Sequence, residues 1–123
     1  MSLIAIAMMA VVMSIVTPAH ALAPAMHVPK GMSNEAMVQL AITTMITTNK
    51  SEARCAKKIA YKESRYRLDA KNKHSSARGV WQLLWGKPHW NIFKQANEAD
   101  RYVQHRYGSW CKALRHHQER NWF

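Results

Sequence analysis

The strongest constraint on this chain is an acidic residue that ends an apolar helical stripe. The stripe has helical spacing and consists of Cys55, Ala56, Ile59, Ala60 and Glu63. The opposite face of the same segment carries lysine and arginine, so its polarity is typical of a helix that packs one side into a core. Burying a carboxylate costs free energy unless it is paired or neutral. Glu63 therefore needs either a partner or a chemical function.

The first half of the chain predicts two helices. Ser33 can cap a first helix over about residues 34–47, which has apolar residues at helical spacing. Ser51 can cap the helix that carries Glu63, and Glu52 is then well placed against the positive end of that helix.

The second half predicts an irregular lobe followed by more helices. Residues 68–78 are polar and allow at most a short hairpin. Pro88 can start a short helix, and Asn97 can cap a longer one that stops at Gly108. Ser109 can cap a last helix. One face of that helix is formed by Trp110, Ala113, Leu114 and His117. The expected fold class is mainly α.

Length and charge restrict the organisation and the partners. The chain has 123 residues, enough for one small domain. It contains 18 Lys and Arg against 7 Asp and Glu, and no charged side chain precedes Lys30. A net charge of +11 favours an anionic partner, such as nucleic acid, an anionic membrane or an acidic cell-wall polymer. The same charge also fits a solvated basic surface without a specific partner.

The N-terminal segment has the outline of a secretory signal, although it lacks a basic residue at its start. An apolar run over residues 3–16 precedes a proline and a small-x-small pattern that ends at Ala21. We expect residues 1–21 to be a cleaved signal peptide or a retained membrane anchor that contacts lipid through the apolar run. Residues 22–33 then form a linker, and residues 34–123 form the domain. Such a protein is exported.

The two cysteines, Cys55 and Cys111, predict one disulfide in an exported chain of this size. In the chain-entropy model a bond across so long a loop stabilises the fold by roughly 3–4 kcal/mol. Two buried thiols are the alternative. The sequence has no CxxC pair, and we expect neither a metal site nor a cofactor.

Glu63 has the position of a general acid. Cleavage of a glycosidic bond needs a proton on the leaving oxygen, and a carboxylic acid supplies it near neutral pH only if its pKa is raised. Partial burial by Ile59, Ala60 and Trp81 would raise the pKa of Glu63. A second catalytic carboxylate is not indicated, since the nearest, Asp69, falls in a loop. A single acid suffices if the 6-hydroxyl of the sugar acts as the internal nucleophile.

The spacing of several residues after Glu63 resembles the lytic transglycosylase family, which has a lysozyme-like fold. The similar stretch is Ile59 to Leu83, and it contains Glu63-Ser64, Tyr66, Ala70, the polar turn 72–76 and Gly79-Val80-Trp81-Gln82-Leu83. The family's usual Gly-Leu-Met-Gln is Gly-Val-Trp-Gln here. The resemblance implies a lysozyme-like α+β fold with a small irregular or hairpin lobe, in which Glu63 is the sole acid/base. It also implies that Gln82 lines a glycan groove and that Ser64 orients the acid.

The resemblance extends more weakly over residues 99–123, where the chain is similar to phage-type members. Many relatives have a Tyr-Asn pair in the last helix, whereas this region reads His116-His117-Gln118. We expect Trp81, Tyr66, Ser76 and His117 to contact the substrate together with Ser64 and Gln82. Packing in the core is the alternative for Trp81, and a surface or packing position is the alternative for His117.

The expected activity is cleavage of the β-1,4 bond between MurNAc and GlcNAc in peptidoglycan, with a 1,6-anhydro product. The alternatives are a lysozyme that uses water and the same acid, or a degenerate domain that binds nucleic acid or an anionic membrane. A phage origin, as an endolysin or a virion protein, fits the small size, and it would make other virion proteins partners. Peptidoglycan is the expected partner, and nucleic acid is the least expected one.

Overall fold

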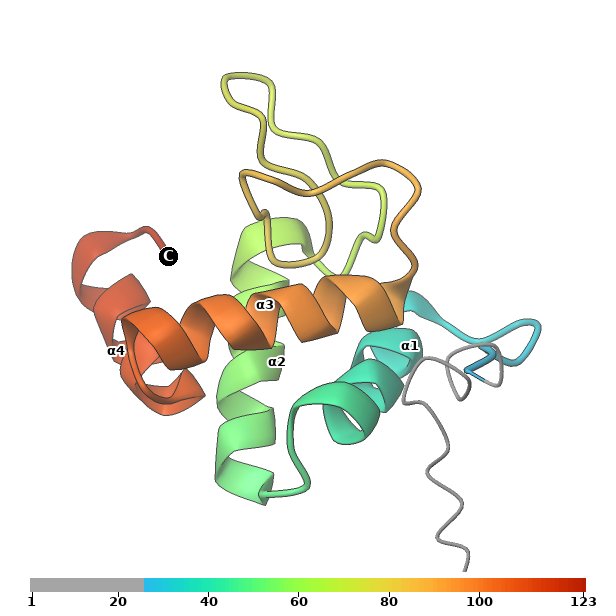
Figure 1. Ribbon diagram of the computed structural model, residues 1–123, viewed down its shortest axis with the longest axis horizontal. Helices are drawn as coiled ribbons and strands as arrows, with labels where there is room; N and C mark the ends of the chain where they lie inside the picture. Colours follow the sequence, from blue (N-terminus) through green and yellow to red (C-terminus); the bar gives the residue numbers. More distant parts are fainter. Residues whose placement is uncertain (1–25) are drawn as a thin grey trace, which may run out of the picture.

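The computed structural model describes residues 26–123, and this part of the chain is mainly helical (Figure 1). The elements are α1 (Asn34–Ala41), the π-helical turn η2 (Ile42–Ile46), α2 (Lys50–Ser64), α3 (Ile92–Arg106) and α4 (Trp110–Arg120). The predicted mainly α class is confirmed. The predicted signal or anchor, residues 1–21, lies outside the described residues, as does the start of the predicted linker.

The first predicted helix is confirmed as α1 and its continuation η2. The hydroxyl of Ser33 accepts a hydrogen bond from the backbone N–H of Ala36 at 3.2 Å, so Ser33 is the expected cap. Val38, Ala41 and Ile42 are fully buried. These residues give the helix one side that packs into the core.

Helix α2 begins earlier than predicted, because Asn49 rather than Ser51 is its cap. The side chain of Asn49 accepts a hydrogen bond from the N–H of Glu52 at 3.0 Å. Asn and Ser are equally good caps, and here the backbone turns at Asn49, whose own N–H is held by the hydroxyl of Thr47 at 3.0 Å. The helix ends at Ser64, and the next residue, Arg65, is in the left-handed conformation with φ of 56°.

Two predictions about the chain around helix α3 are wrong, namely where the helix starts and whether a short helix precedes it. It begins at Ile92 and is capped by Asn91, which accepts a hydrogen bond from the N–H of Lys94 at 2.8 Å. Asn97 therefore lies inside the helix instead of capping it. The helix starts earlier because its buried stripe is continuous and consists of Ile92, Phe93, Gln95, Ala96, Ala99 and Val103. No separate helix follows Pro88, where the chain forms a turn.

Both predicted boundaries between the last two helices are confirmed. Gly108 follows the end of α3 with φ of 80°, and the hydroxyl of Ser109 caps α4 by accepting from the N–H of Lys112 at 3.2 Å. The predicted face of α4 is buried, namely Trp110, Ala113, Leu114 and His117.

Residues 65–91 form an irregular lobe between α2 and α3, at the top of Figure 1. Two isolated antiparallel bridges, Lys71 with Arg78 and Arg78 with Leu83, are the only β pairing within residues 26–123. Buried Gln95 of α3 holds this lobe: its Oε1 accepts from the N–H of Val80 at 2.8 Å, and its Nε2 donates to two lobe carbonyls at 3.1 Å. The lobe is thus fixed by hydrogen bonds to a helix instead of by a sheet.

Helix α2 packs mainly on α4, and the indole of Trp81 from the lobe fills the space beside them. Its Nε1 donates to the carbonyl of Ala56 at 3.1 Å, and its ring centroid lies 6.0 Å from that of Trp110. The irregular lobe therefore inserts one large side chain into the helical core. Among residues 26–123, no helix has the length and apolar character needed to cross a membrane.

Candidate active site

The carboxylate of Glu63 lies at the C-terminal end of α2 and contacts one histidine. Its Oε1 is 2.9 Å from Nε2 of His117 on α4, and the two side chains are 19% and 11% exposed. Burial raises the pKa of Glu63, while the hydrogen bond and the charge of His117 act in the opposite direction with a smaller effect. The predicted direction of the shift is confirmed.

The disulfide sets the register that brings these two side chains together. Cys55 and Cys111 are bonded, with their Cα atoms 5.1 Å apart, so the predicted disulfide is confirmed. Glu63 follows Cys55 by eight residues and His117 follows Cys111 by six, which correspond to about 12 Å and 9 Å along the two helices. Because α2 and α4 leave the disulfide in the same general direction (Figure 1), the acid and the histidine meet at the far end of the contact.

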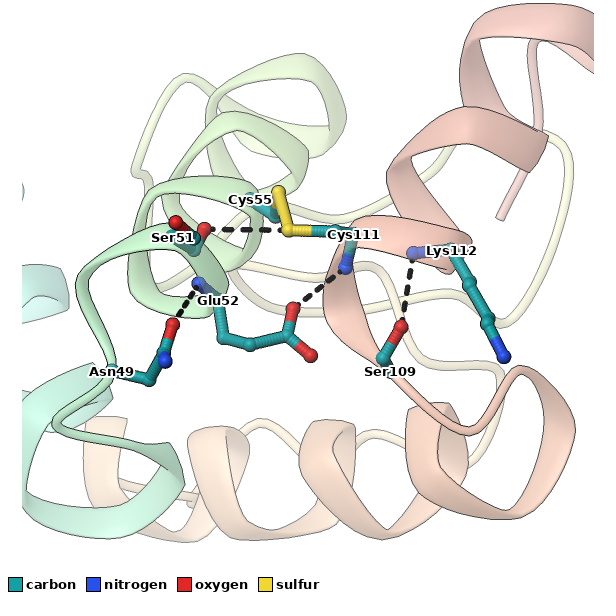
Figure 2. Close-up of a disulfide and its surroundings, with 7 residues drawn as sticks. All are labelled: Asn49, Ser51, Glu52, Cys55, Ser109, Cys111 and Lys112. Carbon is teal, nitrogen blue, oxygen red and sulfur yellow. Dashed lines mark hydrogen bonds between the residues drawn. A yellow bond between two sulfur atoms is a disulfide. The ribbon is translucent and has the colours of Figure 1, made fainter.

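A hydrogen bond joins α2 and α4 at the disulfide end of their contact (Figure 2). Oε2 of Glu52 accepts from the backbone N–H of Cys111 at 2.8 Å, so a residue of α2 satisfies the exposed N-terminus of α4. Among the described residues, Glu52, Cys55 and Cys111 alone bring three possible metal ligands within 4.8 Å of one another. The two sulfur atoms are bonded to each other, so this trio is a structural disulfide and offers no thiolate to a metal.

The other ring nitrogen of His117 is unusual, because Nδ1 is buried and has no hydrogen-bond partner among the described residues. The tautomer that carries its proton on Nε2 donates to ionised Glu63 and avoids burying an unpaired N–H. Protonated Glu63 could instead donate to Nε2, and the imidazole proton would then lie on the unpaired Nδ1. These two states differ by one proton, so protonation of Glu63 reverses the direction of the hydrogen bond and leaves an unpaired N–H at Nδ1.

Two predicted site residues are buried in the structure. The hydroxyl of Ser64 donates to the carbonyl of Ala60 at 3.1 Å within its own helix, so no hydrogen bond joins it to Glu63. Trp81 is 1% exposed and belongs to the core, which leaves it no free face for a sugar. The alternative prediction for Trp81, that it packs in the core, is therefore confirmed.

The other predicted residues lie near the surface in separate places. Gln82 is half-buried, and its side-chain amide donates to the carbonyls of Gly79 and Ala70 at 2.9 and 3.2 Å. Ser76 is exposed and donates to the carbonyl of Leu84 at 2.8 Å. Gln82 therefore supports its own turn, and it lines a small cavity of about 120 Å³ with Trp85, Tyr102 and Phe123 among others.

Tyr66 and His117 line a larger groove, of about 560 Å³, between α2 and the end of α4. The α2 side of the groove carries five cations, Arg54, Lys57, Lys58, Lys62 and Arg65. Tyr61 lies among them, 44% exposed, with the guanidinium of Arg65 4.5 Å from its ring centroid. Groove volumes of this size are typical of ligand sites.

Sequence reasoning did not find this groove or the pairing of Glu63 with His117. The helical spacing of the cations predicted a basic face on α2. The groove forms only because the end of α4 lies beside that face, and the sequence does not show this packing. Comparisons of this chain with protein-family models, with curated proteins and with solved structures find no match. The candidate site therefore rests on its own geometry and on the motif spacing.

Proposed function

We propose that this protein is a lytic transglycosylase of lysozyme-like fold that cleaves peptidoglycan between MurNAc and GlcNAc, acting after export or from a virion. The observation that carries the proposal is Glu63, a carboxyl with a raised pKa at the end of a helix, held by His117 beside a groove. The spacing from Glu63-Ser64 to Gly79–Leu83 supports it independently.

In the first step, protonated Glu63 donates its proton to the oxygen that bridges the two sugars. The bond between this oxygen and C1 of MurNAc breaks, and the GlcNAc residue leaves as an alcohol. Burial favours the protonated form of the acid at a higher pH than an exposed carboxyl allows, which is what this step requires.

In the second step, the Glu63 carboxylate accepts the proton of the 6-hydroxyl of MurNAc, and O6 bonds to C1. The product is a 1,6-anhydro sugar, no water is consumed, and the acid returns to its starting state. The nucleophile belongs to the substrate itself, so its proximity replaces a second carboxylate.

His117 acts on this reaction through Glu63 and is a positioning residue. Its Nε2–H fixes one carboxylate oxygen, and the hydrogen bond favours the ionised form that the second step needs. Burial therefore favours the protonated Glu63 that the first step needs, and the hydrogen bond favours the carboxylate that the second step needs.

A basic binding module is the second candidate, and the five groove cations are the observation that favours it. Such a module would use the groove for an anionic polymer and would leave the Glu63 carboxyl without a chemical function.

The decisive experiment uses purified cell-wall sacculi incubated with wild-type protein or with Glu63→Gln, followed by mass spectrometry of the soluble fragments. We expect fragments with anhydro ends, lighter by one water than hydrolysis products, from the wild type alone. Fragments with reducing ends would instead indicate a lysozyme. Sacculi bound equally by both proteins and cleaved by neither would contradict the enzymatic proposal and favour the binding module.

A further inference from the structure

Most of the positive charge that lines the groove between α2 and α4 has no ion-pair partner within the described part of the chain. Of its five cations, Lys57 alone has an ion pair, with Glu35 at 2.8 Å. Within the described part of the chain, Arg54, Lys58, Lys62 and Arg65 have no carboxylate within 4.0 Å, and no acidic residue lines the groove. Like charges so close repel one another, so an anionic ligand would lower the free energy of this surface.

The length of the row formed by the five cations restricts the size of the ligand that the groove can bind. Arg54 and Arg65 are eleven residues apart on one helix face, a distance of about 16 Å. An extended peptide of about five residues has this length. The row therefore fits several carboxylates carried by a short extended chain better than it fits one isolated anion.

One side chain separates the groove from the acid. His117 lines the groove, and Nε2 of His117 lies 2.9 Å from Glu63. A ligand that fills the groove therefore reaches the histidine that holds Glu63, the acid proposed to cleave the bond between MurNAc and GlcNAc. Peptidoglycan carries a short peptide with free carboxylates on each muramyl residue, so a charged peptide is covalently attached next to that bond.

We infer that the cationic groove, defined by Arg54, Lys57, Lys58, Lys62 and Arg65, binds the acidic peptides of the glycan strand. This inference rests on the proposed function and specifies its substrate as a strand that still carries peptides, in preference to bare glycan. The tyrosines supply the rest of the site, because Tyr61 offers an exposed ring and Tyr66 a half-buried one within the same groove.

The test measures binding, so that it does not depend on catalysis. Full-length Glu63→Gln protein is sedimented with sacculi that retain their peptides and with the same sacculi after an amidase has removed them. The groove variant adds Arg54→Glu, Lys58→Glu and Lys62→Glu. The control adds Lys73→Glu, Lys112→Glu and Arg115→Glu, which are exposed, lie outside the groove and change the net charge equally. Circular dichroism establishes that both variants are folded.

We expect the Glu63→Gln protein to bind peptide-bearing sacculi about tenfold more tightly than peptide-free sacculi. The groove variant should lose this preference, the control should keep it, and added salt should weaken it. Equal binding to both kinds of sacculi, or a preference that survives in the groove variant, would overturn the inference. Groove-dependent binding that persists without peptides and disappears when wall phosphodiester polymers are extracted would also overturn it, in favour of those polymers.

This outcome is separable from the proposed function. If wild-type protein releases anhydro fragments but shows no peptide preference, the enzyme stands and the groove inference fails. If peptide-dependent binding is found and no strand is cleaved, the groove stands and the enzymatic proposal fails.

Discussion

The two ends of the contact between α2 and α4 are built from similar residues for opposite purposes. At one end, Glu52 accepts a hydrogen bond from the backbone N–H of Cys111 beside the disulfide (Figure 2). At the other end, Glu63 is buried against His117, its pKa is raised, and one imidazole nitrogen is left without a partner. Both glutamates link α2 to α4, but only Glu63 has a pKa that burial raises.

The comparison teaches where chemistry can be expected in a small domain. The disulfide at one end links α2 and α4 covalently, and this link can offset the cost of burying Glu63 at the other end. Perturbed acids in clefts are candidates for catalysis for this reason. Substitutions of Glu63 should consequently change activity, which substitutions of Glu52 should not do. Their effects on the free energy of unfolding should also have opposite signs.

The largest effect should come from Glu63→Gln, measured as the rate of release of soluble glycan fragments from sacculi. Because a glutamine can neither donate nor accept the proton, we expect the rate to fall about 10²–10⁴-fold. Glu119→Gln, at an exposed acid of α4, is the matched control and should keep the wild-type rate. An active Glu63→Gln variant would place the chemistry elsewhere.

Removing the disulfide should have the largest effect on folding. The bond closes a loop with a sequence separation of 56 residues, so Cys55→Ala with Cys111→Ala should lower the free energy of unfolding by about 4 kcal/mol. Guanidinium denaturation measures this loss. Reductant should destabilise the wild type to a similar extent and leave the double variant unchanged; a wild type that resists reductant would show that the register is held by packing alone.

His117→Phe should change the pH dependence of cleavage more than the fold. The hydrogen bond from His117 lowers the pKa of Glu63, so its removal should move the alkaline limb of the pH–rate profile to higher pH. His117→Gln restores a donor and should shift the limb back towards the wild-type position. If the two variants have the same profile, the histidine does not act through Glu63.

Glu52→Gln should destabilise the protein by about 1 kcal/mol, because a neutral acceptor replaces the charged one on the N–H of Cys111. The measurement is again the free energy of unfolding at neutral pH. Comparison with Glu63→Gln tests the difference between the two ends directly, because Glu52→Gln should lower the free energy of unfolding and Glu63→Gln should raise it.

The smallest effect should be a gain in stability of Glu63→Gln at neutral pH. The folded protein binds the Glu63 proton more tightly than the unfolded chain, so the wild type loses stability as the pH rises from the ordinary carboxyl range through the raised pKa. Above this window the glutamine variant should melt at a higher temperature than the wild type, and below it the difference should disappear. A variant that melts lower at neutral pH would mean that ionised Glu63 stabilises the fold.

Local patterns were sufficient where one short stretch of chain decides the outcome. The cap at Ser109, the stop at Gly108 and the buried face of α4 depend on neighbouring residues, and all were predicted correctly. The cap at Asn97 was wrong, because burial of Ile92 and Phe93 extends α3 beyond the point where capping preference alone would start it. Trp81 and Ser64 lay within the recognised motif, yet their side chains are buried.

The sequence by itself determined a mainly helical domain, two cysteines that could pair and an acid on the apolar face of its helix, because spacing and residue type limit these features locally. Only the tertiary structure decided which residue meets that acid, since His117 and Glu63 are joined by the packing of α4 on α2 and not by any short-range pattern. The cationic groove has the same origin: its charges lie on one helix, but its second wall comes from another.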